Sequence, residues 1–381
     1  MPSTSDFCAA LTDGPSSPLG AACGGSSHGS GNDATPLRQR ILALADQLAD
    51  QLADHSRGEL VEGVLRHLVA IGHATQEQSD WALLNGALED IRDGLSVFCP
   101  HRYRRKVGVV GSARVPPESA VYQQAVELSQ RLAASGFEVM TGAGEGVMEA
   151  ANLGAGQDKS YGLSIHLPFE FAANPYIDPQ TRLVVFRYFF TRKHFLVQES
   201  DALVAMPGGV GTLDELFEAL TLIQTAKTVP VPVVLLAPAG DDYWQRWKSY
   251  MVKSVEERGM VSPADAQIYD QVDSAEAAVD IIRRFYRIFH SCRFLGGERL
   301  QLLLHGTPTD EQLRTINHVF SDLLLGGSIE PFTHRSEQGV YPGLQFQFDH
   351  RCMGRLYELI RHLNHLPLAG GTRLEHPEQR Q

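Results

Sequence analysis

The sequence predicts an α/β fold built on a doubly wound parallel sheet, with an N-terminal helical unit and a small C-terminal α+β domain. Two observations support this prediction. Across the middle of the 381-residue chain, short runs of β-branched and apolar residues alternate with helical patterns, which is typical of parallel strands covered by helices on both faces. Two of these runs also end in glycine-rich turns, and the carboxyl ends of parallel strands are where such sheets bind ligands.

Composition and periodicity divide the chain into five parts. The first is rich in Ser, Gly, Pro and Ala, and it cannot bury enough apolar surface to offset its ordering entropy, so we expect a disordered tail. Amphipathic patterns follow, including LADQLADQLAD, and predict about three helices that serve packing or dimerisation. The expected limits are 1–36 for the tail, 37–100 for the helical unit, 101–290 for the core, 291–370 for the α+β domain and 371–381 for a frayed C-terminus.

The core begins after a basic segment, HRYRRK at 101–106, which we interpret as a linker. The expected strands are Val107–Val110, Glu138–Thr141, Gly162–Leu167, Leu183–Phe186, Ala202–Met206 and Val231–Leu236. The helical patterns between them include Tyr122–Ser135, Gly146–Gly154, Lys193–Ser200 and Thr212–Gln224. The alternation predicts βαβ units.

The C-terminal part has a different order of patterns. Its expected strands and helices follow one another as β-α-β-β-α, and a partial ferredoxin-like arrangement is one interpretation of that order. The elements are Leu300–Leu304, Asp310–Leu325, Ser328–Thr333, Gly343–Phe348 and Met353–Leu363.

Charge and cysteine content exclude several classes of protein. The formal net charge of -12 is opposite to what a general nucleic-acid binder needs, so no nucleic-acid partner is expected. The five cysteines are widely spaced and form no C-x-x-C pair, which favours a reducing compartment over a disulfide framework or a zinc ribbon. The first residues lack the pattern of a secretory signal and no stretch is long and apolar enough to span a membrane, so we expect a cytoplasmic protein.

The sharpest motif is MPGGVGTLDE at 206–215, which follows an expected strand and opens an expected helix. Gly208, Gly209 and Gly211 allow the backbone to approach a phosphate at the positive end of that helix. Thr212 can cap the helix and donate its hydroxyl to an anion. Glu215 lies three residues further on, so it is a candidate catalytic carboxylate or, alternatively, the partner of Thr212 in a capping box.

A second glycine cluster, TGAGEGVME at 141–149, lies at another strand-to-helix junction. It departs from the dinucleotide pattern because Val147 stands where the third glycine should be. Gly142, Gly144 and Gly146 are therefore predicted to contact a single nucleotide held between two turns. Ser112, in the turn after the first strand, adds a hydroxyl at the same edge, or belongs to an ordinary tight turn.

A basic pair, Arg192 and Lys193, precedes Glu215 by one helix and one strand, so both could reach the same edge of the sheet. Positive charge at a helix start is unfavourable to the helix dipole. That misfit indicates that Arg192 faces a ligand or a carboxylate. Lys193 is a candidate phosphate ligand, with a solvated side chain as the alternative.

Four segments resemble the LOG (Lonely guy) family, once widely labelled lysine decarboxylases. They are GSAR at 111–114, TGAGEGVMEAAN at 141–152, TRK at 191–193 and PGGVGTLDE at 207–215. The resemblance implies a Rossmann-like nucleotide-binding core and phosphoribohydrolase activity on AMP-like or cytokinin riboside monophosphates. It implies that Arg192 and Glu215 are the catalytic pair, that the PGG glycines and Thr212 bind phosphate, and that the protein forms a homodimer or a higher homo-oligomer.

The chain departs from the family pattern at Glu145, where proline is usual, and at Leu153, where arginine is usual. A carboxylate beside a phosphate loop repels the anion unless it turns away or meets a ribose hydroxyl. We see no residue set for pyridoxal chemistry, no metal-ligand spacing, and therefore expect no cofactor and no metal.

The expected mechanism uses Glu215 to stabilise an oxocarbenium-like ribose, with its neighbour Asp214 pointing elsewhere. Two alternatives belong to other classes: a nucleotide or molybdenum-cofactor carrier, and a regulatory protein that senses a metabolite. A carrier need not keep both Arg192 and Glu215, so their joint presence favours the enzyme.

Overall fold

The structure is a computed structural model that describes residues 47, 58–75, 77–167, 172–336 and 339–368. The predictions for the tail at 1–36, for the LADQLADQLAD helix and for the C-terminus at 371–381 lie outside these residues. The chain divides into two compact units, Met1–Asp80 and Trp81–Gln381. This division falls at none of the limits expected from the sequence, and those limits stay predictions. The described part of the first unit contains the amphipathic helix α3, Gly58–Ala74.

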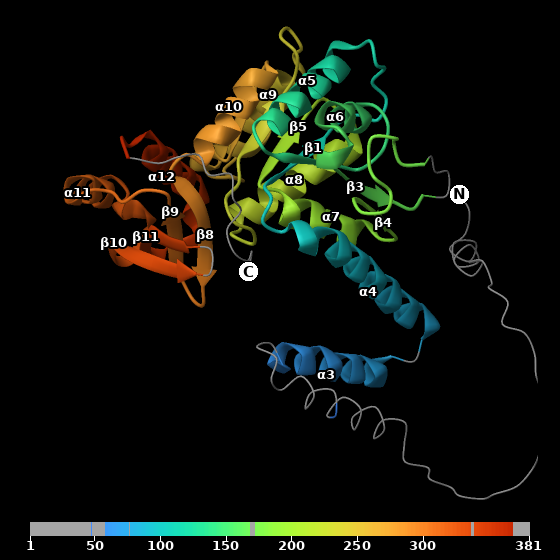
Figure 1. Ribbon diagram of the computed structural model, residues 1–381. Helices are drawn as coiled ribbons and strands as arrows, with labels where there is room; N and C mark the ends of the chain where they lie inside the picture. Colours follow the sequence, from blue (N-terminus) through green and yellow to red (C-terminus); the bar gives the residue numbers. More distant parts are fainter. Residues whose placement is uncertain (1–46, 48–57, 76, 168–171, 337–338, 369–381) are drawn as a thin grey trace, which may run out of the picture. The chain divides into compact units, whose positions relative to one another are not determined.

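A seven-stranded sheet forms the centre of the second unit (Figure 1). Its order is β4-β3-β2-β1-β5-β6-β7, and every pair of neighbours is parallel. The chain adds β2, β3 and β4 on one side of β1 and then returns to add β5, β6 and β7 on the other side. The strands are β1 Lys106–Val110, β2 Glu138–Thr141, β3 Ser160–Ile165, β4 Leu183–Phe186, β5 Ala202–Ala205, β6 Val233–Leu236 and β7 Tyr269–Val272. The doubly wound prediction is therefore confirmed.

Helices cover both faces of this sheet and enclose two apolar clusters. One cluster lies under α5 Ala120–Ala134, α6 Val147–Ala155 and α10 Ala275–Phe285. The other lies under α4 Gln78–Phe98, α7 Phe189–Glu199, α8 Val210–Gln224 and α9 Tyr243–Tyr250, and it continues into the C-terminal part of the chain as far as Leu363. Short 3-10 helices lie at Cys99–His101, Gln157–Lys159, Pro263–Gln267, Ser321–Leu323 and His350–Cys352, with a π-helix at Met251–Glu256. Strands β1, β2, β5 and β6 are buried throughout, as the continuous apolar runs require.

The C-terminal part is a four-stranded antiparallel sheet of order β10-β11-β9-β8 (Figure 1, orange to red). Its elements are β8 Phe289–Leu295, β9 Arg299–Leu304, α11 Asp310–Val319, β10 Leu324–Ser336, β11 Gly339–Phe348 and α12 Met353–His365. Strand β11 lies between β9 and β10, which makes β9-α11-β10 the split unit of a ferredoxin-like fold. Strand β8 was not predicted, and it precedes this unit as a hairpin partner of β9.

Several expected boundaries were wrong for local physical reasons. The helix expected at Asp310–Leu325 ends at Val319, because a 3-10 turn and then the long strand β10 use the following residues. Helix α7 begins at Phe189, before the expected Lys193, since its aromatic first turn carries no helical periodicity. Strand β7 was not predicted, because its sequence YDQV is half polar.

The basic segment at 101–106 is only partly a linker. Arg105 and Lys106 are almost fully buried, and Lys106 is the first residue of β1. The Arg105 guanidinium lies 3.1 Å from the Asp201 carboxylate and donates to the His290 carbonyl at 2.9 Å. Burial of these charges is possible because each has an acceptor, which residue type alone could not reveal.

Among the described residues, no helix has both the length and the apolar character that crossing a bilayer requires.

Candidate active site

Three loops meet at the carboxyl edge of the sheet, after β1, β2 and β5. The Ser112 amide donates to the Pro207 carbonyl at 3.1 Å, and the Ser112 carbonyl accepts from the Val147 amide at 3.0 Å. The turn after β1 is thus bonded to both glycine-rich segments. The Ser112 hydroxyl accepts from the Arg114 amide at 3.1 Å within its own turn. This bond is the one that an ordinary tight turn makes, which is the alternative interpretation of Ser112. The Ser112 backbone joins the two loops.

The glycine cluster after β2 is held in a conformation that few residues adopt. Gly146 has φ 63° and ψ −124°, and a Cβ at this position would lie 2.4 Å from the Ser112 carbonyl oxygen. Ala143 has φ 63° although it is not a glycine, and such strain persists only where the surroundings impose it. Here the Ala143 amide donates to the Thr141 hydroxyl at 3.0 Å, and the Ala143 carbonyl accepts from the Asn174 amide at 2.9 Å.

Two buried asparagines complete this arrangement. The Asn174 side-chain amide donates to the Gly144 carbonyl at 3.1 Å and to the Asn152 side-chain oxygen at 3.0 Å. The same Asn152 oxygen accepts from the Thr141 hydroxyl at 2.7 Å. These bonds hold the loop in place, because Thr141, Asn174 and the Gly144 carbonyl would each lose a partner if the loop moved.

The glycine loop after β5 is organised differently. Helix α8 begins at Val210 with Gly209 as its N-cap and without a side-chain cap. The alternative of a capping box between Thr212 and Glu215 is therefore wrong: Thr212 is the third residue of the helix, and Glu215 lies in its second turn. Gly208 makes room for the Thr212 side chain, since a Cβ there would lie 2.2 Å from the threonine hydroxyl.

This loop presents backbone amides at a helix start. The Leu213 amide donates to the Gly209 carbonyl at 3.2 Å, and the amides before it belong to the first turn, whose N–H groups have no acceptor inside the helix. Gly209, Val210 and Gly211 are exposed. An anion that approaches here meets outward-facing donors and the positive end of the helix dipole.

Arg192 and Glu215 form an ion pair through Nη2 and Oε1, as the sequence predicts. Their side chains are only 12% and 13% exposed. A Cβ on Gly142 would lie 3.2 Å from Arg192 Nη2, so the guanidinium lies against the first glycine of the cluster after β2. The structure thus brings together the Glu215 carboxylate, the Arg192 guanidinium and both glycine segments at one edge of the sheet.

The ionisation of Glu215 is governed by two opposing effects. Burial raises the pKa of the Glu215 carboxyl above its ordinary value, and the nearby charge and hydrogen bond of Arg192 offset this only in part. Burial has the larger influence of the two. A carboxylate of this kind binds a proton more readily than an exposed glutamate, which favours a role in proton transfer.

Lys193 does not lie at the glycine loops. Its ammonium group lies 2.7 Å from the Asp214 carboxylate and 3.1 Å from that of Glu218, and the side chain is 18% exposed. The alternative of a solvated lysine is therefore wrong. Burial lowers the pKa of Lys193, but the hydrogen bonds to Asp214 and Glu218 outweigh it and raise the pKa. The Asp214 carboxylate pairs with Lys193, whereas Glu215 pairs with Arg192, so the two neighbouring carboxylates have different partners, as expected.

The two departures from the family pattern, Glu145 and Leu153, are both exposed. Glu145 is therefore able to turn toward solvent instead of toward an anion on the loop. Across the ranges that the structure describes, no set of three or more His, Cys, Asp or Glu side chains is placed to hold a metal ion.

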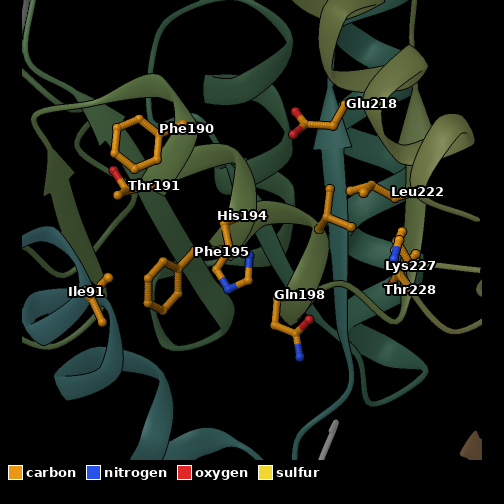
Figure 2. A pocket seen from close by; sticks show the side chains of 11 residues that line it. Ile91, Phe190, Thr191, His194, Phe195, Gln198, Glu218, Leu222, Lys227 and Thr228 are labelled. Carbon is orange, nitrogen blue, oxygen red and sulfur yellow. The ribbon is translucent and has the colours of Figure 1, made fainter. Parts of the chain in front are cut away.

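A cavity of about 430 Å³ lies elsewhere, between α4, α7 and α8 (Figure 2). Figure 2 shows Phe190, His194 and Gln198 of α7 on one side of it, with Glu218 and Leu222 of α8 opposite. Its lining includes neither Arg192 nor Glu215. The cavity is therefore separate from the paired site at the sheet edge.

Three residues whose side chains bond the backbone near the site were missed in the sequence: Asp90 bonds the Tyr188 amide at the start of α7, and Asn174 and Tyr243 bond the two glycine loops. The Tyr243 hydroxyl donates to the Gly208 carbonyl at 2.7 Å and so fixes the loop after β5. Asn174 and Tyr243 carry no local signal. Asp90 does, because it lies midway between Gly86 and Gly94 in an otherwise amphipathic helix.

A doubly wound parallel sheet, with glycine turns at its carboxyl edge around a buried arginine–glutamate pair, places the protein in the Rossmann-like fold class. A family model described as "Possible lysine decarboxylase" matches residues 146–282. The chain is 33% identical over 187 residues to the probable cytokinin riboside 5′-monophosphate phosphoribohydrolase LOGL5 of Oryza sativa subsp. japonica, a match that covers 48% of this chain and 71% of the rice protein. The chain therefore belongs to the LOG family.

Two further proteins show how far the similarity extends. The cytokinin riboside 5′-monophosphate phosphoribohydrolase LOG3 of Arabidopsis thaliana is 38% identical over 93 residues, which cover 24% of this chain and 40% of the plant protein. The structure of the molybdenum cofactor binding protein from Rippkaea orientalis has 25% sequence identity and a TM-score of 0.34, over 47% of this chain and 96% of that chain.

Proposed function

We propose that this chain hydrolyses the N-glycosidic bond of a nucleoside 5′-monophosphate, either AMP-like or a cytokinin riboside monophosphate. The products are the free base and ribose 5-phosphate. The observation that carries the proposal is the buried ion pair of Arg192 and Glu215, which lies against Gly142 at the carboxyl edge of the sheet. The activity named for the rice and Arabidopsis relatives supports the same reaction.

The phosphate would bind at the start of α8. Gly208, Gly209 and Gly211 let it approach the backbone, and the first-turn amides together with Thr212 would donate to it. The phosphate takes no part in bond breaking. It supplies binding energy that positions the ribose, so nucleosides without it should be poor substrates.

The glycine cluster after β2 would hold the rest of the nucleotide. Gly142, Gly144 and Gly146 form a closely packed wall, with the Met148 side chain against the first two. Ser112 lies where this wall meets the loop after β5. We expect the ribose to lie between this wall and Glu215. Lys193, held by Asp214 and Glu218, would offset part of the negative charge that these two carboxylates place near the phosphate.

The reaction breaks the bond between C1′ and the base nitrogen, and the base departs with the bonding electrons. Positive charge develops on the ribose, and the Glu215 carboxylate stabilises it and orients a water molecule toward C1′. Glu215 accepts one proton as the water oxygen bonds to C1′, and that proton passes to the departing base. Arg192 orients Glu215 and favours its charged form against the effect of burial.

We also expect a cytoplasmic homodimer or higher homo-oligomer that uses no cofactor, no metal and no nucleic acid. The spacing of the cysteines supports the compartment.

The test is to incubate the purified protein with a panel of nucleoside monophosphates and the matching nucleosides, and to measure ribose 5-phosphate. Glu215→Gln should lower kcat by about 100-fold or more, as loss of a general base does, while nucleotide binding stays within a few-fold. Glu127→Gln is the matched control, because it makes the same change to an exposed glutamate of α5 that pairs with Arg131. If Glu215→Gln hydrolyses at the parent rate, or if the parent releases no ribose 5-phosphate from any nucleotide, the proposal is wrong.

A further inference from the structure

Helix α4 buries one residue in every four along a single stripe: Gly86, Asp90, Gly94 and Phe98. The two glycines allow close contact with α7. A Cβ on Gly86 would lie 2.9 Å from the Tyr188 ring, and one on Gly94 would lie 2.4 Å from the Phe195 ring. A side chain at either position would push the two helices apart. The stripe therefore sets how closely α4 can approach the N-terminal half of α7.

Asp90 lies at the middle of this contact and is 4% exposed. Its Oδ1 accepts from the Arg187 amide at 2.9 Å, and its Oδ2 accepts from the Tyr188 amide at 3.1 Å and from the Thr191 hydroxyl. Tyr188 is the N-cap of α7 and makes no side-chain cap of its own. A carboxylate is the group best suited to the positive end of a helix, and here another helix supplies it.

The bonded residues adjoin Arg192. The Tyr188 carbonyl accepts the Arg192 amide at 3.2 Å, and Thr191 is its immediate neighbour. Asp90 thus holds both ends of the turn from which the Arg192 side chain departs toward Glu215. Fixing that turn fixes the point and the direction in which the Arg192 side chain leaves the backbone, because χ1 has only three staggered positions. The far end of the side chain is then held by the Glu215 carboxylate.

We propose that Asp90 is a positioning residue that caps α7 from α4 and thereby aligns Arg192 with Glu215. What Arg192 does in the reaction rests on the proposed function, but the alignment itself does not. Within the part of the chain that is described, the partners of Asp90 all belong to residues 187–191. Burying a carboxylate is costly unless its hydrogen bonds are satisfied, and here the start of α7 supplies the side-chain bonds of Asp90. Helix α4 therefore contributes directly to the geometry of the site.

The experiment compares Asp90→Asn with Asp93→Asn. Asp93 is a carboxylate on the same helix, it is 48% exposed, and it pairs with Arg92, so its variant reports the general effect of lost charge on α4. Asp90→Asn keeps the shape of the side chain but loses the charge and one of its acceptor oxygens. We expect kcat to fall by about tenfold or more, as misplacement of a catalytic group causes, with little change in KM, while Asp93→Asn matches the parent.

Thr191→Val provides a second variant that removes only the hydroxyl bonded to Asp90. If the two act through one turn, the double variant should lose no more activity than Asp90→Asn alone, since effects within one network are not additive. A purely structural role would lower thermal stability and leave kcat per folded molecule unchanged, which would overturn the proposal.

Crystal structures of the two α4 variants separate this proposal from the proposed function. In Asp90→Asn the contact between Arg192 and Glu215 should be lost or disordered, and in Asp93→Asn it should persist. This comparison needs no activity. An inactive parent protein would contradict only the proposed hydrolase activity. An unchanged Arg192–Glu215 contact in Asp90→Asn would contradict the positioning role of Asp90, even if the enzyme is active.

Discussion

The two glycine segments at the sheet edge are built in opposite ways. After β2, polar side chains hydrogen-bond the loop: Thr141 bonds the Ala143 amide, Asn174 bonds the Gly144 carbonyl, and Ala143 has a positive φ. After β5, the loop leads directly into α8 and leaves an exposed helix start at Val210, with Tyr243 bonded to the Gly208 carbonyl. The segment after β2 is therefore a rigid wall, while the segment after β5 keeps its backbone N–H donors available for an anion.

The largest expected effect comes from Gly146→Ala, which would break the rigid wall. The new Cβ meets the Ser112 carbonyl at 2.4 Å, and the backbone has φ 63°. Backbone strain and overpacking together should cost roughly 2–5 kcal/mol in the free energy of unfolding. Hydrolysis should fall by about 100-fold, because the wall and Arg192 would shift together. Denaturant unfolding and ribose 5-phosphate release measure the two effects.

Gly156→Ala is the matched control for this change. Gly156 also has a positive φ, 79°, but a Cβ there meets nothing within 4 Å. It should show the backbone strain alone, about 1–3 kcal/mol, with kcat preserved. Equal losses of kcat in the two variants would contradict the idea that the contact between Gly146 and Ser112 shapes the site.

The sequence was sufficient to predict the sheet and the meeting of Arg192 with Glu215. Buried parallel strands are continuous apolar runs, and one helix plus one strand between two residues returns the chain to the same edge. The order of the C-terminal sheet was harder to predict from the sequence. Strand β8, FHSCRFL, mixes polar and apolar residues, and it is recognisable as a strand only through its pairing with β9.

The local details of the site depend on contacts that sequence order hides. Thr212 and Glu215 have the spacing of a capping box, yet α8 starts two residues earlier because Gly209 can serve as the N-cap. Asp90 acts on a turn about 100 positions away. Burial of Glu215, which outweighs Arg192 in setting its pKa, also arises only once the helices pack.

A smaller effect is expected from Asn174→Ala, which loosens the wall without a collision. The change removes the bonds to the Gly144 carbonyl and to Asn152, and it should cost about 1–3 kcal/mol in unfolding free energy because buried partners are left unpaired. We expect kcat to fall as well. Asn317→Ala is the control, since Asn317 bonds Leu313 and Ile329 in the C-terminal sheet domain. If both variants lose stability but neither loses kcat, the wall does not position the nucleotide.

The smallest expected change in stability, and one of opposite sign, comes from Gly211→Ala in the open loop. A Cβ there meets nothing within 4 Å, and its φ lies outside the left-handed region, so alanine should stabilise the fold by about 0.4–1 kcal/mol through the unfolded chain. The methyl group would nevertheless occupy the space in which a phosphate approaches the backbone. KM for nucleotides should therefore rise while the protein becomes more stable. Gly296→Ala, which also meets nothing within 4 Å and lies in the β8–β9 turn, should leave KM unchanged. A Gly211→Ala protein with the parent's KM would show that the phosphate does not bind at the start of α8, and the contrast between a rigid wall and an open anion site would then lose its functional meaning.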